Sequence, residues 1–137
     1  MYGFRRVPLS PGPLRNQEQF GRAFAPQYHP TFPILMADIT PTELRQRQQA
    51  GETPTIIDVR ETWEHEEAAM SGAQNIPLGT LPDKLDDLDE WKNQEIIVHC
   101  KSGGRSASAK AFLTQQGFTN VRNLLGGYSA YAAEGKS

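Results

Sequence analysis

The sequence predicts an α/β domain in which short buried strands alternate with helices. Continuous apolar runs at 55–59 and 95–99 are typical of buried strands, and segments with helical spacing and end signals occur at about 41–50 and 106–116. The two kinds of segment alternate along the chain. We therefore expect a central, mostly parallel sheet of about five short strands with helices on both faces.

The first helix has the clearest end signals. Thr40 is a suitable N-cap residue, Pro41 fits the first helical position, and Glu43 stands where a capping box places an acid. Gly51 ends the segment, so we expect a helix over about 41–50.

The other elements follow in chain order. Trp63 and Trp91 are expected in the core. Leu81, Leu85 and Leu88 share one side of an expected amphipathic helix whose other side is acidic. Gly117 is expected to end the helix of 106–116. Besides these, we expect strands at 55–59, 74–76, 95–99 and 121–125, and helices at 61–67 and 128–133.

Composition limits the possible functions. A chain of 137 residues is sufficient for one domain with a core, and no apolar run approaches the roughly 20 residues of a membrane helix. A net charge of -2 gives no general reason to bind nucleic acid. One cysteine cannot form an intramolecular disulfide, which favours a reducing compartment, and we expect a cytoplasmic protein. Its three dispersed histidines predict no metal site.

The first 38 residues differ in kind from the rest. Residues 1–33 hold six of the ten prolines, and four arginines against one acid give this part a charge of +3. Prolines interrupt both helices and strand ladders, so we expect residues 1–38 to form an extended or irregular arm or linker. The same prolines argue against the amphipathic helix of a transit peptide. Residues 39–137 are the expected single domain.

Cys100 is the candidate nucleophile. It directly follows the strand expected at 95–99 and precedes a helix, which is the edge of an α/β sheet where active sites lie. Backbone N–H groups of residues 101–105 can converge on an anion, and the following helix adds the positive end of its dipole. Both effects lower the pKa of a thiol and increase the fraction of reactive thiolate.

A structural role for Cys100 is the alternative. A lone cysteine at the end of an apolar strand is commonly a small buried hydrophobic residue. The polar segment that follows argues against this reading, because a structural cysteine does not require it. Gly103 and Gly104 permit the dihedrals that converging amides need, and Lys101 and Arg105 add positive charge at the rim.

Several motifs occur together in order between residues 39 and 133. They are Ile57-Asp58-Val59-Arg60, then Glu64, Gly72-Ala73-x-Asn75-Ile76-Pro77, Cys100-x4-Arg105-Ser106 and Asn123-Leu124-x-Gly126-Gly127. This combination resembles the rhodanese family of sulfurtransferases. The form Cys-Lys-x-Gly-Gly-Arg-Ser-Ala also resembles rhodanese domains that work with E1-like adenylyltransferases of molybdopterin and thiamine synthesis. The chain departs from the family pattern at Ala68-Ala69-Met70 and at Tyr131, which affects local packing and substrate fit.

The resemblance implies a rhodanese-like fold and sulfur transfer. A Cys100 thiolate would take the sulfane sulfur of an anionic donor, thiosulfate or a persulfide, and pass it from a Cys100 persulfide to a thiophilic acceptor without a cofactor. A ubiquitin-like sulfur carrier or an adenylyltransferase is the kind of partner implied. The substrate-binding residues expected are Lys101, Ser102, Gly103, Gly104, Arg105 and Arg60, with Asp58, Glu64 and Ser106 in support.

Two other functions stay open. Phosphatases and arsenate reductases with similar loops place five residues between the cysteine and the arginine, and this chain has four, which favours sulfur over a larger phosphoryl group. A non-catalytic interaction module is the other alternative, and the presence of Cys100 with Arg105 argues against it.

Other polar residues near Cys100 have structural roles as alternatives. His99 adjoins Cys100, but successive strand residues point to opposite faces, so we expect His99 to be structural. Glu64 lies in an acidic, solvated helix and is expected to support the loop. Asp58 and Arg60 could orient Arg105 or meet the donor, and an ordinary buried ion pair is the equal alternative.

Overall fold

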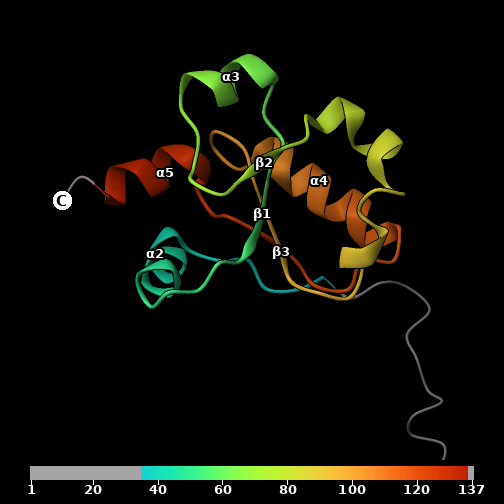
Figure 1. Cartoon of the computed structure of the whole chain (residues 1–137), viewed down its shortest axis with the longest axis horizontal. Coiled ribbons are helices and arrows are strands. Elements are labelled where there is room, and N and C mark those ends of the chain that lie inside the picture. Colours follow the sequence, from blue (N-terminus) through green and yellow to red (C-terminus); the bar gives the residue numbers. More distant parts are fainter. Residues whose placement is uncertain (1–34, 136–137) are drawn as a thin grey trace, which may run out of the picture. The chain divides into compact units, whose positions relative to one another are not determined.

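A computed structural model describes residues 35–135 of the chain. Within them, parallel strands form one sheet in the order β2-β1-β3-β4 (Figure 1). The strands are β1 (Thr55–Asp58), β2 (Gln74–Asn75), β3 (Ile96–His99) and β4 (Val121–Asn123). The expected α/β class with a parallel sheet is confirmed. Apart from its last residues, the arm expected at 1–38 lies outside the described part.

The expectation of about five strands is wrong, because the described sheet has four. Ile39 forms a single parallel bridge to Leu124 and no ladder. Its N–H donates to the carbonyl of Asn123 and its carbonyl accepts from Leu125. Pairing stops there because Pro41 lacks an N–H and the helix α2 (Pro41–Gln49) begins at once.

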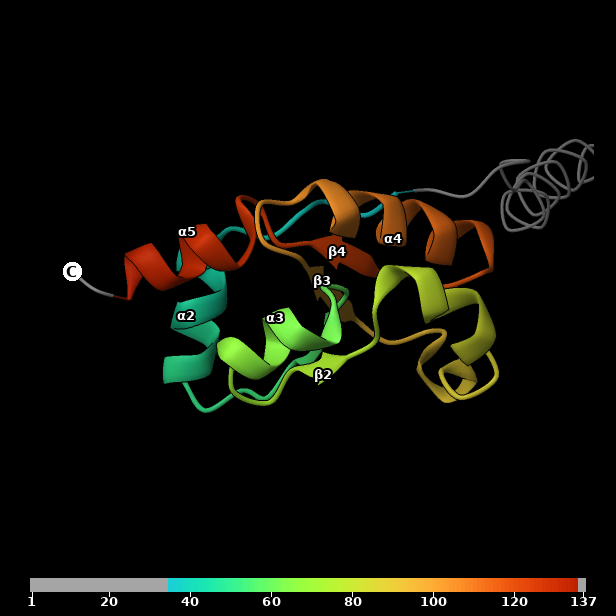
Figure 2. The same ribbon diagram turned by 90° about the horizontal axis from the view of Figure 1, so that it is seen from above.

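Helices cover both faces of the sheet, as expected. On one face, Ala109 and Leu113 of α4 (Gly104–Gln115) pack with Ile57 and Val98 of the strands. On the other face, Leu44 of α2 packs with strand residues, and α5 (Gly127–Glu134) joins this second core. Figure 2 shows α4 alongside β4, with α2 and α5 together at another part of the sheet.

The acidic segment after β2 is helical, but it is not the α-helix that leucine spacing predicts. It forms two 3₁₀ helices, η3 (Leu78–Lys84) and η4 (Asp89–Trp91). Pro82 lies inside η3 and has no N–H to donate, which disfavours a continuous α-helical ladder. Leu81 and Leu88 are nevertheless buried, so the predicted apolar side faces the core.

Only one of the two tryptophans packs against the core. Trp63 lies on α3 (Thr62–Glu67) and is 61% exposed, so its expected core position is wrong, whereas Trp91 is partly buried against the α4 side of the sheet. The short helix α3 buries none of its own residues. No helix among the described residues combines the length and apolar character that crossing a membrane requires.

We predict that Leu113→Ala destabilises the fold by about 2–5 kcal/mol, because Leu113 is completely buried and its truncation leaves a cavity. The free energy of unfolding in urea measures this change. Gln115→Ala, at an exposed position of the same helix, is the matched control and should change stability by less than about 0.5 kcal/mol. Equal effects of the two substitutions would contradict the assigned packing.

Candidate active site

Cys100 lies at the junction between β3 and α4, where the sequence places it. The strand ends at His99, the loop 101–103 follows, and α4 begins at Gly104 with Gly103 as its N-cap residue. Gly103 has φ +114°, a left-handed conformation that favours glycine, so this residue allows the tight turn. Cys100 is 1% exposed while Lys101, Ser102 and Gly104 are exposed, and the sulfur therefore lies at the floor of the loop.

Hydrogen-bond donors surround the sulfur. The backbone N–H of Gly103 donates to Cys100 Sγ over 3.0 Å, and Ser106 Oγ lies 3.4 Å from it. Burial by itself raises the pKa of the thiol. Hydrogen bonds from the Ser106 hydroxyl and from the backbone N–H groups of Ser106, Gly103 and Ser102 outweigh burial, so the pKa of Cys100 lies below that of an ordinary cysteine. Of the N–H groups expected to converge at residues 101–105, those of Ser102 and Gly103 bond to the sulfur, and the N–H of Ser106 joins them.

Asn123 links the Cys100 loop to β4. Its side-chain N–H donates to the carbonyl of Gly103 over 3.3 Å, and its Oδ1 accepts from Ser106 Oγ over 2.6 Å. The amide therefore holds both the turn residue and the hydroxyl that contacts the sulfur. The sequence motif contains Asn123, but sequence reasoning assigned it no role. A buried amide at the end of the strand beside the cysteine strand is the signal that could have found it.

The start of α5 lies directly against the loop. The N–H groups of Tyr128 and Ser129 donate to the carbonyls of Cys100 and Lys101 over 2.8 and 3.0 Å. A Cβ on Gly127 would lie 2.6 Å from the Cys100 carbonyl oxygen and 2.5 Å from that of Lys101. Gly127 is therefore required for this close approach, a role that sequence reasoning did not assign.

Glu64 binds Arg105 with two hydrogen bonds. Arg105 Nη1 donates to Oε2 over 2.7 Å and Nη2 to Oε1 over 3.1 Å. Glu64 Oε2 also accepts from the N–H of Glu61 in the capping box of α3. The guanidinium of Arg105 lowers the pKa of Glu64 to about 2, although burial opposes this change. Glu64 thus contacts the loop through Arg105, and its supporting role stays a prediction.

Asp58 and Arg60 form a buried ion pair beside the loop. Arg60 Nη2 donates to Asp58 Oδ2 over 2.8 Å and to the carbonyl of Ala68 over 2.7 Å. His65 Nδ1 lies 2.8 Å from the same carboxylate, and the guanidinium lies over the Tyr128 ring. Burial raises the pKa of Asp58, but hydrogen bonds from Arg60 and His65 outweigh it and bring the pKa to about 2.

His99 is buried on the face of the sheet opposite to Cys100. Cys100 packs in the core on the α4 side, whereas His99 lies near Tyr128, at 6.2 Å between ring centroids, so the two residues occupy opposite faces as expected. Burial lowers the pKa of His99, which keeps the ring neutral near pH 7. Its Nε2 is buried without a hydrogen-bond partner, 3.9 Å from Asp58 Oδ2.

The structure brings the predicted site residues together at one end of the sheet, but it pairs two of the expected donor-binding cations internally. Arg105 is bound to Glu64, and Arg60 is 4% exposed and bound to Asp58, the alternative that the sequence left open. Binding of a donor by these residues stays a prediction. Within residues 35–135, no group of three or more His, Cys, Asp or Glu side chains could hold a metal ion.

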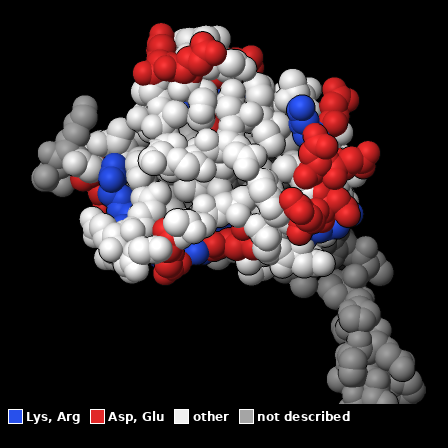
Figure 3. All heavy atoms as spheres, viewed as in Figure 1, with Lys and Arg blue, Asp and Glu red and all other residues white. Residues whose placement is uncertain are grey.

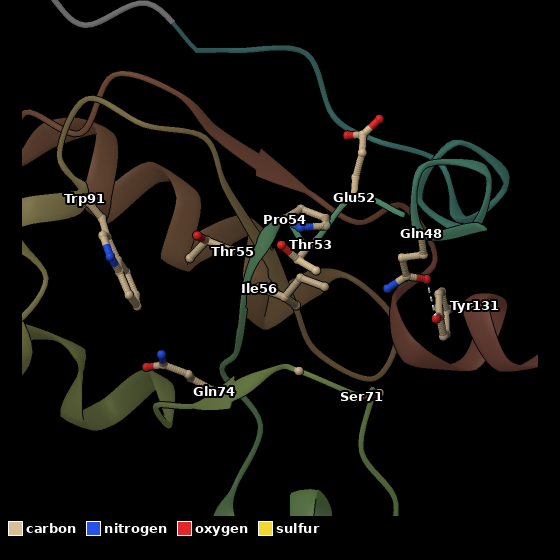
Figure 4. Close-up of a pocket in the computed structure, with 11 residues that line it drawn as sticks. Gln48, Glu52, Thr53, Pro54, Thr55, Ile56, Ser71, Gln74, Trp91 and Tyr131 are labelled. Atoms are coloured by element: carbon tan, nitrogen blue, oxygen red, sulfur yellow. Dashed lines mark hydrogen bonds between the residues drawn. The ribbon is translucent and has the colours of Figure 1, made fainter. Parts of the chain in front are cut away.

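A hollow of about 530 Å³ lies away from Cys100 (Figure 4). It borders the beginning of β1 at Thr55, whereas Cys100 follows the end of β3, and β1 and β3 are parallel. Figure 4 shows Trp91 and Gln74 on one side of it and the hydrogen-bonded Gln48 and Tyr131 on another. None of the predicted site residues lines this hollow.

A model of the rhodanese-like domain matches residues 40–134 of the chain. The chain belongs to the rhodanese-like domain family. A sulfurtransferase of Allochromatium vinosum is 31% identical over 101 residues, which are 74% of this chain and 92% of that protein. A crystal structure of a Staphylococcus saprophyticus protein matches with a TM-score of 0.65 and 35% identity, covering 73% of this chain and 97% of that one.

Adenylyltransferase-associated rhodanese domains are also among the relatives, as the loop motif predicts. A maize protein named adenylyltransferase and sulfurtransferase is 30% identical over 103 residues. The matched segment is 72% of this chain and 22% of that protein. The likeness therefore concerns one rhodanese-like domain within a longer polypeptide.

We predict that Ser106→Ala raises the pKa of Cys100, because the substitution removes the hydroxyl whose one proton can be donated to the thiolate in place of Asn123 Oδ1. At pH 7 the rate of alkylation by iodoacetamide should fall by about two- to tenfold, as expected for one hydrogen bond. The rate measured as a function of pH gives the pKa directly. Ser108→Ala, exposed on the same helix, is the control. An unchanged or lower midpoint in Ser106→Ala would contradict this role.

We predict that Asp58→Asn destabilises this rhodanese-like domain by about 3–5 kcal/mol near pH 7, because it leaves the buried Arg60 without its counter-ion. The carboxylate has a folded-state pKa of about 2 against 3.8 for the ordinary group, so the folded state binds fewer protons. Its contribution is complete above about pH 4 and is lost as the pH falls towards 2.

Urea unfolding between pH 2 and 7 tests both parts of this prediction. The stability of the unsubstituted protein should fall between about pH 4 and pH 2, and Asp58→Asn should remove part of that slope. Asp87→Asn changes an exposed carboxylate and serves as the control. A slope that Asp58→Asn leaves intact would show that this carboxylate is not the titrating group.

Proposed function

We propose that the protein is a sulfurtransferase that carries a sulfane sulfur as a persulfide on Cys100. The donor is thiosulfate or a persulfide, and the acceptor is a thiophilic group. One observation carries the proposal: the buried sulfur of Cys100 accepts a hydrogen bond from the Gly103 amide and lies beside the Ser106 hydroxyl, which together favour a thiolate. Family membership and the sulfurtransferase among the relatives support the same chemistry.

The proposed cycle has two transfers. The Cys100 thiolate attacks the sulfane sulfur of the donor, a new bond forms between Sγ and that sulfur, and the bond to the remainder of the donor breaks. Sulfite or a thiolate leaves with the electron pair. A nucleophilic acceptor then attacks the outer sulfur, and Cys100 leaves again as the thiolate that the loop stabilises.

The loop would stabilise both the thiolate and the persulfide of Cys100 during this cycle. The N–H groups of Ser102 and Gly103 face the sulfur, and the twelve-residue helix α4 begins beside it with its positive end. Because these donors are backbone groups held by Asn123 and α5, little reorganisation accompanies the change of charge. No cofactor takes part in the proposed reaction.

A protein acceptor is proposed from the relatives. The maize adenylyltransferase and sulfurtransferase joins a domain similar to this chain to a longer polypeptide, which favours an adenylyltransferase or a sulfur-carrier protein as partner. A reducing compartment would preserve the Cys100 thiol between cycles, so we propose that the protein acts in the cytoplasm.

Intact-mass spectrometry tests the function. After incubation with thiosulfate, or in parallel with a small persulfide, the protein should gain the mass of one sulfur atom, and reduction by a thiol should remove it. Cys100→Ser should gain nothing, and Ser108→Ala should gain sulfur like the unsubstituted protein. No adduct from either donor would leave Cys100 as a structural cysteine. Hydrolysis of an aryl phosphate instead would favour the phosphatase alternative.

A further inference from the structure

We propose that Glu64 determines donor specificity by neutralising Arg105, so that the site prefers a persulfide of a thiol to the dianion thiosulfate. This inference rests on the proposed function and names its substrate class. The observation behind it is that Glu64 forms two hydrogen bonds with Arg105. Arg105 carries the first side chain of α4, and without Glu64 it could bind an anion beside Cys100.

The Glu64 carboxylate is held in place from two sides. Oε2 accepts from Arg105 Nη1 over 2.7 Å and from the Glu61 N–H over 3.0 Å, and the Glu64 side chain is 12% exposed. Arg105 is 37% exposed, so a donor could reach it, but each of its two terminal nitrogens already donates one N–H to Glu64, and the guanidinium also faces the Cys100 sulfur. An anionic donor would have to share the guanidinium with a fixed negative charge.

The other charges near the loop do not replace Arg105. The charge of Arg60 is cancelled by Asp58 inside the protein. Of the cations in loop 101–105, Lys101 is the one that forms no ion pair with a described residue. Helix α3 and its N-cap residue add the exposed acids Glu61, Glu66 and Glu67. Acidic side chains gather at the top of Figure 3, where α3 lies in the same view of Figure 1.

The charge carried by the reacting groups separates the two donors. When the Cys100 thiolate attacks thiosulfate, the reacting assembly has a charge of about -3, and the S–S bond breaks to release sulfite with the electron pair. When it attacks the outer sulfur of R–S–SH, the charge is about -1, and R–S⁻ leaves with the electron pair while the proton stays on the transferred sulfur. A site whose arginine is already paired stabilises the smaller charge better.

Paired reagents of similar shape measure this effect without any sulfur transfer. Iodoacetate is anionic and iodoacetamide is neutral, and both alkylate a thiolate, so the ratio of their rates reports the charge that the reagent meets at Cys100. In Glu64→Gln the amide can still accept the capping hydrogen bond, but the negative charge is gone. The rate with iodoacetate divided by the rate with iodoacetamide, the alkylation ratio, should rise by about tenfold, as expected for one nearby unit charge at a protein surface.

Glu66→Gln is the matched control, because it removes the same charge from an exposed position of the same helix. It should change the alkylation ratio by less than about twofold, since solvent and salt screen an exposed charge. The rate of turnover with thiosulfate divided by the rate with mercaptoethanol persulfide should likewise rise in Glu64→Gln and change little in Glu66→Gln. In the unsubstituted protein, the persulfide should be the faster donor.

Several results would overturn the inference. One is an alkylation ratio in Glu64→Gln that equals the ratio in the unsubstituted protein or in Glu66→Gln. Another is faster turnover of thiosulfate than of the persulfide by the unsubstituted protein. Salt dependence in Lys101→Gln, which removes the unpaired cation of the loop, gives a second measurement. With Arg105 neutralised, the alkylation ratio of this variant should change less than about twofold between 0.02 and 0.5 M salt. A steep fall would show that Arg105 acts as an unpaired cation.

The experiments can reject the proposed function and the role of Glu64 separately. If neither donor places sulfur on Cys100, the proposed function is wrong, whatever the alkylation ratio shows. If sulfur is transferred but Glu64→Gln leaves both ratios unchanged, the function stands and the role of Glu64 is wrong.

Discussion

The hydrogen bond from the Gly103 N–H to the sulfur of Cys100 is the contact on which the site depends. Cys100 is almost completely buried, and burial alone would keep a thiol protonated. Only donors that converge on the sulfur reverse this effect. Their convergence requires a turn in which Gly103 adopts φ +114°, so the chemistry of the thiol and the conformation of one glycine are linked.

The rest of the domain holds this turn from two directions. Asn123 at the end of β4 binds the Gly103 carbonyl and the Ser106 hydroxyl, while the first N–H groups of α5 bind the carbonyls of Cys100 and Lys101. The latter contact is possible because Gly127 has no Cβ. The closing helix is thus part of the loop's support, and the backbone donors around the sulfur are fixed before any substrate arrives.

Both arginines near the loop are paired with carboxylates, Lys101 is its unpaired cation among the described residues, and hydrogen bonds are the main stabilisation of the thiolate. Asp58 cancels Arg60 in the interior, and Glu64 cancels Arg105 at the rim. Paired charges hold their partners in defined positions but attract a distant anion weakly. Recognition of a donor then depends on its fit to the loop and on the charge of its leaving group, and cationic residues near a cysteine do not by themselves indicate an anionic substrate.

Local chemistry in the sequence determined the α/β class, the bounds of α2, the end of α4 and the position of Cys100, because caps, turn glycines and apolar runs act over a few residues. Helix α4 begins at Gly104, earlier than the expected start at 106. Contacts between distant segments were decided only by the tertiary structure. These include the single bridge of Ile39, the exposure of Trp63 and the partners of Arg60 and Arg105. Whether a strand pairs or a cation is neutralised depends on what folding brings beside it, and residue spacing carries no such information.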